Sequence, residues 1–156
     1  MKLSLKSAIF WGGITVGVLD LLDAFVFFWL RSGAMPIAIL HSIAAGWMGR
    51  DAARAGGMRT AAIGLASHFL IAFIIATFYI LASRVIPVLR RQWLICGVLY
   101  GVAAYFVMTW FVVPLSNAGN GQITFALPVM PVMTNGVLIH AIGVGLPAAF
   151  FSSRTR

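Results

Sequence analysis

Five ionisable side chains stand inside apolar stretches of this sequence, and they are the residues best placed to do chemistry. They are two aspartates and all three histidines, namely Asp20, Asp23, His41, His68 and His140. An ionisable group inside a membrane segment costs about 2.5 to 3.5 kcal/mol even on lenient insertion scales, so each should have a partner. We therefore treat these residues as a candidate intramembrane polar cluster.

Several roles are compatible with such a cluster. The first is a satisfied network of aspartate with histidine and with Tyr100, Tyr105 or Thr109, which fixes helix register and needs no cofactor. The second is proton-linked transport through Asp20. The third is a haem or transition-metal site at His68 and His140, because axial ligation needs two histidines. Copper bound with methionine sulfur is a further alternative, and the five positions can also be unrelated. We adopt the first interpretation.

Composition narrows the class of protein. Of the 156 residues, 62% are hydrophobic and 9% are charged, against about 25% charged in a soluble domain. The net charge is +8, but the basic residues are separated by apolar runs and form no face for a nucleic acid, so we expect none as a partner. The single cysteine, Cys96, allows neither an intrachain disulfide nor a cysteine metal cluster.

Four apolar stretches are long enough, or nearly so, to cross a bilayer, which takes about 20 residues. The sequence therefore predicts an all-α, polytopic membrane protein, a four-helix antiparallel bundle in a single domain over residues 1–156. Residues 36–48 are apolar but too short to span, and they predict a re-entrant or interfacial helix with Pro36 in its first turn and Gly49 after its end. The predicted spans are residues 8–30, 60–82, 93–115 and 134–151.

Small residues recur every three or four positions in each predicted span, which places them on one helical face. Gly13 and Gly17, and likewise Gly97 and Gly101, have the GxxxG spacing of closely packed membrane helices. Asp20, His68 and His140 lie on the same stripes, so we expect them to face the bundle interior. Counting about 1.5 Å per residue puts both histidines about 9 to 12 Å deep from one side, with Asp20 and Asp23 close by.

The basic residues indicate orientation, because cytoplasmic loops carry the excess of lysine and arginine. With both termini in the cytoplasm, seven lie inside and four outside. The inside set is Lys2, Lys6, Arg84, Arg90, Arg91, Arg154 and Arg156, and the outside set is Arg31, Arg50, Arg54 and Arg59.

The sequence resembles a group of uncharacterised small bacterial inner-membrane proteins, the YagU-like proteins. The stretches that carry the resemblance are LDLLDAF at Asp20, HSIAAGWMG at His41, GLASHFLIAF at His68, LICGVLYGVAAYFVMTWFVVPLS, and NGVLIHAIGVGLP at His140. The resemblance implies a four-helix protein of the bacterial inner membrane and assigns no reaction.

These observations predict a nonenzymatic membrane protein, an accessory subunit of a larger membrane complex or a stress-related protein. Catalysis has little support, since the chain has no glutamate and no serine-centred nucleophile motif. The expected partners are the lipid bilayer and other membrane-protein subunits or further copies of this chain. The alternative is a haem- or metal-binding redox component, or a proton-linked transporter, that uses the intramembrane histidines and aspartates.

Overall fold

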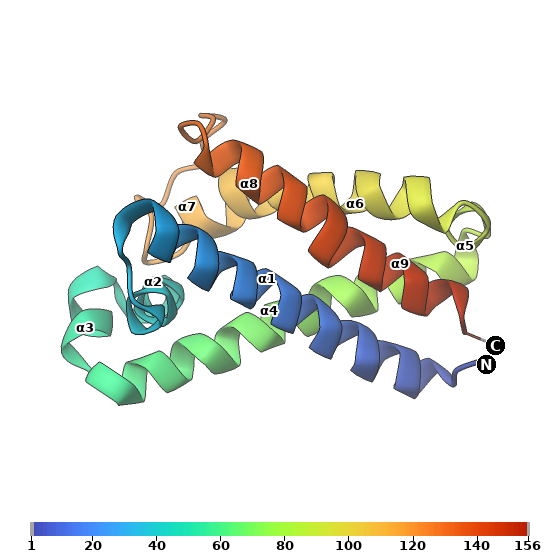
Figure 1. Ribbon diagram of the computed structural model, residues 1–156, viewed down its shortest axis with the longest axis horizontal. Coiled ribbons are helices and arrows are strands. Elements are labelled where there is room, and N and C mark those ends of the chain that lie inside the picture. The colour runs from blue at the N-terminus through green and yellow to red at the C-terminus, as the bar shows by residue number, and fades with distance from the viewer. Residues whose placement is uncertain (1, 156) are drawn as a thin grey trace.

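The computed structural model describes residues 2–155, and no β-strand occurs among them. Four long helical segments run along its longest dimension (Figure 1), and each is apolar and long enough to cross a membrane. The prediction of an all-α membrane bundle with four spanning segments is thus confirmed. The four are α1 (Leu5–Ser32), α4 (Gly57–Val85), a third made of α6 (Trp93–Val107), the π-helical η1 (Met108–Val112) and α7 (Val113–Leu115), and a fourth made of α8 (Val132–Ile139), the π-helical η2 (His140–Gly145) and α9 (Leu146–Ser153).

The four segments alternate in direction, so the two chain ends lie together (Figure 1). The backbone N–H of Leu3 donates to the carbonyl of Arg154 at 2.8 Å there. The short helix α5 (Val88–Arg91) makes the turn between the second and third segments at the same end. The other two connections lie at the opposite end.

Helix α2 (Pro36–Met48) has the bounds predicted for the short apolar helix. Pro36 occupies its first turn, where the missing N–H costs nothing. Gly49 ends it with φ of 83°, a conformation that only glycine adopts without strain. A second short helix, α3 (Arg50–Ala55), follows directly and was not predicted. Asp51 in its first turn and Arg54 in its last complement the helix dipole.

The spanning segments are slightly longer than the apolar stretches that predicted them. The third keeps the predicted ends, whereas the other three extend two or three residues further at each end. Hydropathy marks only the part of a helix that suits hydrocarbon, and the polar turns beyond it remain helical.

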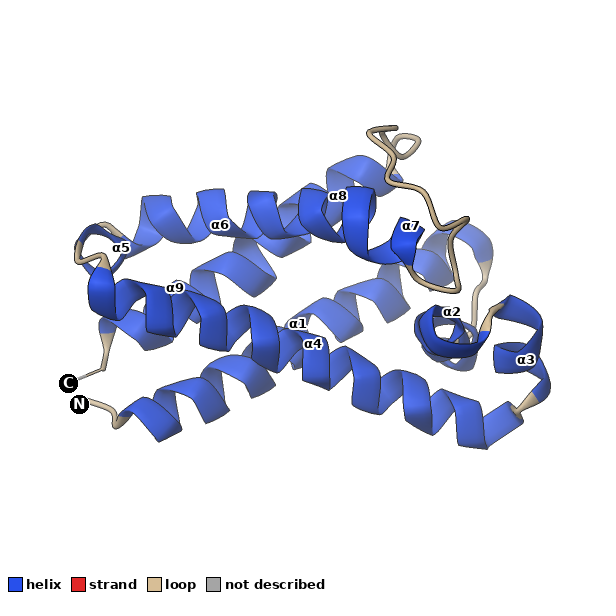
Figure 2. Ribbon diagram, turned by 180° about the vertical axis from the view of Figure 1, so that it is seen from behind, coloured by secondary structure: helices blue, strands red, loops and turns tan. Residues whose placement is uncertain are grey.

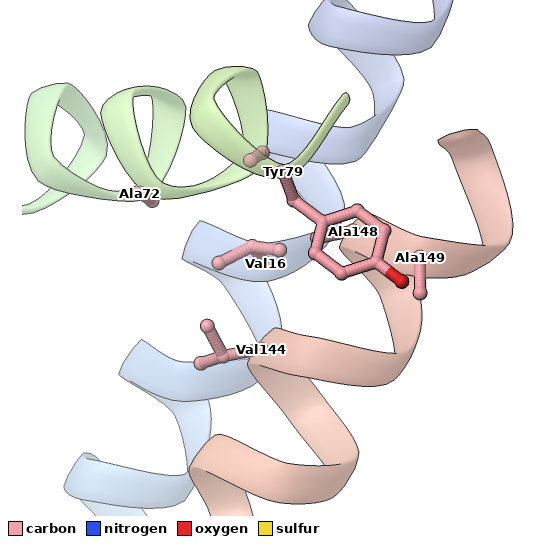
Figure 3. Packing of buried hydrophobic residues seen from close by; sticks show 7 residues of the cluster. Val16, Ala72, Tyr79, Val144, Ala148 and Ala149 are labelled. Carbon is pink, nitrogen blue, oxygen red and sulfur yellow. The ribbon is translucent and has the colours of Figure 1, made fainter. Parts of the chain in front are cut away.

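Alanine and small aliphatic side chains fill the centre of the bundle, where α1, α4 and the fourth segment meet (Figure 3). Small side chains let helix backbones approach closely, which is how membrane helices associate when lipid is as apolar as the core. Tyr79 is the largest buried member, and its hydroxyl donates to the carbonyl of Leu89 at 2.9 Å. The cluster consists of Val16, Ala72, Ala76, Tyr79, Val144, Ala148 and Ala149.

Both GxxxG pairs lie at helix contacts. The aromatic rings of Phe73 and Phe69 occupy the space where side chains on Gly13 and Gly17 would stand, so α4 packs directly on the backbone of α1. Gly101 lies against the backbone of His140 in η2, and Gly97 and Gly145 approach each other through their main chains. The glycine spacing thus determines which faces of these helices meet.

Candidate functional site

An acid and histidine site lies inside the bundle, between α1 and the fourth segment. The Nδ1 atom of His140 is 3.7 Å from Oδ1 of Asp20, and the side chains retain 17% and 24% of their exposure. That distance is too long for a hydrogen bond. Nδ1 of His140 is buried without a hydrogen-bond partner.

Asp23 stands one helical turn from Asp20 on the same helix. Its Oδ2 accepts a hydrogen bond of 2.7 Å from Nδ2 of Asn135, at the start of α8. This partner was not predicted, because it lies 112 residues away along the chain. The polar amide within an apolar span was the only signal in the sequence that pointed to it.

An aromatic ring from the third segment forms the remaining wall. Tyr105 of α6 is buried, and its ring centroid is 5.4 Å from that of His140, at 72° between the planes. The tyrosine hydroxyl has no hydrogen-bond partner. The site therefore contains two buried polar atoms without a hydrogen-bond partner, and a carboxylate oxygen lies 3.7 Å from one of them.

The backbone around His140 is also unusual. This residue is the first of the π-helical stretch η2, and Gly136 lies against Tyr105 one turn earlier. π-Helical turns inside α-helices occur frequently at functional sites. The extra residue per turn alters which side chains of the fourth segment face α1 and α6.

His68 and His41 each form a hydrogen bond with a backbone carbonyl. Nε2 of His68 donates to the carbonyl of Gly17 on α1 at 2.9 Å, and Nε2 of His41 donates to the carbonyl of Gly57 at 2.9 Å. Each histidine thereby links two helices. The structure brings together Asp20, Asp23 and His140 from the predicted cluster, and it places His68 and His41 at separate helix contacts.

The hydrogen bond of His68 and the positions of the other possible ligands limit how this protein could hold a metal ion or a haem. A ring nitrogen that donates its proton to a carbonyl cannot bind a metal at the same time, which applies to Nε2 of His68. Within residues 2–155, no group of three histidine, cysteine or acidic side chains is arranged to hold a metal ion.

The hydrogen bond between Asn135 and Asp23 leads to a testable expectation. We expect Asn135→Leu to lower the free energy of unfolding in detergent by about 1 to 2 kcal/mol, because it leaves a carboxylate inside the bundle without its donor. Adding Asp23→Leu should then cost less than the sum of the two single changes. Strictly additive losses in SDS titrations would show that the two side chains do not interact.

Comparison with family models, with curated proteins and with solved structures found no match for this chain.

Proposed function

We propose that this is a nonenzymatic membrane protein that acts through contacts within the bilayer, as an accessory subunit of a larger membrane complex or a small stress-related protein. We also propose that the protein is related to the YagU-like proteins and that it lies in the bacterial inner membrane. The intramembrane polar groups of this protein mainly join its own helices, which suits a scaffold better than a reaction centre.

The exposed face of the third segment is the observation that carries the proposal. In its most apolar stretch of 18 residues, only 17% of the residues are buried inside the molecule, against 39% in the corresponding stretch of the fourth segment. Large side chains on α6 point outward, with Ile95 and Leu99 exposed to 61% and 64%. Such a face is available to lipid or to a helix of another membrane protein, and we assign it to a partner helix.

Site-specific crosslinking tests this assignment. A photoreactive amino acid at Leu99 should crosslink a membrane protein, or a second copy of this chain, in native membranes. The same amino acid at Val26 of α1, which is 56% exposed, is the matched control. Mass spectrometry after mild-detergent purification identifies the partner. A chain that purifies alone and crosslinks only lipid from both positions would contradict the proposal.

The proposed orientation places both termini in the cytoplasm and the connection after α7 outside, because the chain ends and α5 carry most of the basic residues. In a Cys96→Ser background, an impermeant maleimide applied to intact cells should label Asn120→Cys and leave Ser4→Cys unlabelled. Disrupting the cells should make Ser4→Cys reactive. Labelling of Ser4→Cys but not Asn120→Cys in intact cells would reverse the orientation.

A second candidate function is proton-linked transport, favoured by the buried, unpartnered Nδ1 of His140 beside Asp20. A proton on that nitrogen would compensate the charge of the carboxylate. Liposomes with a pH-sensitive dye would then report flux that is lost in His140→Gln and kept in Asp51→Asn, a change at an exposed position of α3. Equal flux in protein-free liposomes would eliminate this candidate.

A further inference from the structure

A cavity of about 1030 Å³ lies between α2, α4 and the part of the third segment formed by η1 and α7. Ligand pockets are typically about 300 to 1,000 Å³, so this one is large for a chain of this size. Its walls are mostly apolar, with Ile71 and Ile74 on α4 and Met108 and Val112 on η1. The elements that form it come together at the end of the bundle opposite the chain termini (Figure 2).

The charged groups that line the cavity are of one sign. Arg50 and Arg54 of α3 both belong to its lining, which contains no aspartate. Among residues 2–155, neither guanidinium has a carboxylate within 4.0 Å, although Asp51 lies between them in the sequence. Arg50 donates a hydrogen bond of 3.1 Å to the carbonyl of Ala118, which fixes it at the rim.

Side-chain hydrogen bonds fix the positions of the cavity walls relative to one another. The indole N–H of Trp47 on α2 donates to Oγ of Ser67 on α4 at 2.8 Å. Nδ2 of Asn117, just after α7, donates to the carbonyl of Trp47 at 2.5 Å. The short helix is therefore tied to both neighbouring segments, so the cavity is part of the packed structure.

The lining thus combines a long apolar space with a cationic end. Along α4, the lining from Ser67 to Ile74 rises about 10 Å, which is most of the roughly 15 Å of hydrocarbon in one leaflet. A small free anion would make no favourable contact with such an apolar wall. An uncharged lipid would not neutralise the charge of two arginines. Arginine suits phosphate oxygens because its planar guanidinium donates two parallel hydrogen bonds.

We propose that this cavity binds one anionic phospholipid, with an acyl chain between α2, α4 and η1 and its phosphate beside Arg50 and Arg54. The site is separate from the acid and histidine site. It is also independent of the proposed protein partner, because that partner covers α6.

Native mass spectrometry provides the test. The purified protein is equilibrated with equal amounts of phosphatidylglycerol and phosphatidylcholine that carry the same acyl chains, and the bound lipids are counted. We expect phosphatidylglycerol to dominate in the wild type. Arg50→Gln with Arg54→Gln should lower that preference at least about fivefold, because a single arginine near a membrane surface contributes roughly that factor. Arg31→Gln with Arg59→Gln removes the same charge at the same end outside the lining, and it should leave the preference unchanged.

A second pair of variants tests the apolar part of the site. Ala38→Trp fills the cavity and should reduce bound lipid of either kind, whereas Ala66→Trp on an exposed face of α4 should not. This pair tests whether lipid occupies the cavity even if the double arginine variant fails to fold. Equal loss in the two arginine pairs, full lipid retention in Ala38→Trp, or displacement of the lipid by inorganic phosphate would each overturn the proposal.

Discussion

Gly101→Val is expected to destabilise the bundle strongly, because the third and fourth segments meet backbone to backbone at this glycine. A Cβ atom at this position would overlap the backbone carbonyl of His140. A backbone atom cannot rotate away as a flexible side chain can, so the whole fourth segment would have to move. We expect the free energy of unfolding to fall by about 3 kcal/mol or more, at the upper end of overpacking costs.

The measurement is unfolding by SDS in mixed micelles, followed by circular dichroism. Ala103→Val is the matched control, because it adds a similar side chain to an exposed position two residues away. The control should remain within about 0.5 kcal/mol of the wild type. Similar losses for both variants would show that the third and fourth segments do not meet at Gly101.

Gly64→Val should release the short helix α2 from the bundle. A Cβ atom at Gly64 would overlap the carbonyl of Leu40, so α2 can remain on α4 only because this residue is a glycine. Overpacking that costs about 1 to 3 kcal/mol would raise the population of an open position of α2 at least about fivefold.

The opening of α2 can be measured by the reactivity of a buried cysteine. Ala45 on α2 is 1% exposed, so Ala45→Cys in a Cys96→Ser background should react slowly with a maleimide. Adding Gly64→Val should accelerate the reaction about fivefold or more, whereas adding Ala66→Val on the exposed face of α4 should not. An unchanged rate with Gly64→Val would mean that α2 is not held at this glycine.

The sequence contained enough information to predict the four spans and the helix α2, but not the short helices α3 and α5. Segment length and hydropathy predicted four spans, because hydrocarbon thickness limits the length of an apolar helix. Pro36 and Gly49 marked the ends of the short helix correctly, since both residues act through local backbone geometry. Glycine spacing predicted that the third span would pack through Gly97 and Gly101, because close backbone approach needs that spacing.

The pairing of polar groups was harder to predict. Depth along a helix can be counted from the sequence, but the direction in which a side chain points depends on how neighbouring helices pack. Counting depth grouped His68 and His140 in one cluster, but it identified neither the carbonyl of Gly17 as the partner of His68 nor the closeness of His140 to Asp20. A backbone carbonyl can accept such a bond at almost any helical position, so no sequence pattern identifies it.

The cavity could not be foreseen for a related reason. It depends on the position of α2 between α4 and the residues that follow α7, which is set by contacts such as that of Asn117 with the carbonyl of Trp47. Those residues lie 70 positions apart in the sequence.

The position of α2 is the central structural claim, and a disulfide crosslink in membranes tests it most directly. An ideal Cβ atom at Gly46 lies 3.7 Å from Cβ of Ser116, which is within the range of real disulfides. In a Cys96→Ser background, Gly46→Cys with Ser116→Cys should therefore crosslink under mild oxidation. Gly12→Cys with Ala76→Cys has the same 3.7 Å separation between α1 and α4 and serves as the positive control. A crosslink in the control pair but none between positions 46 and 116 would contradict the placement of α2.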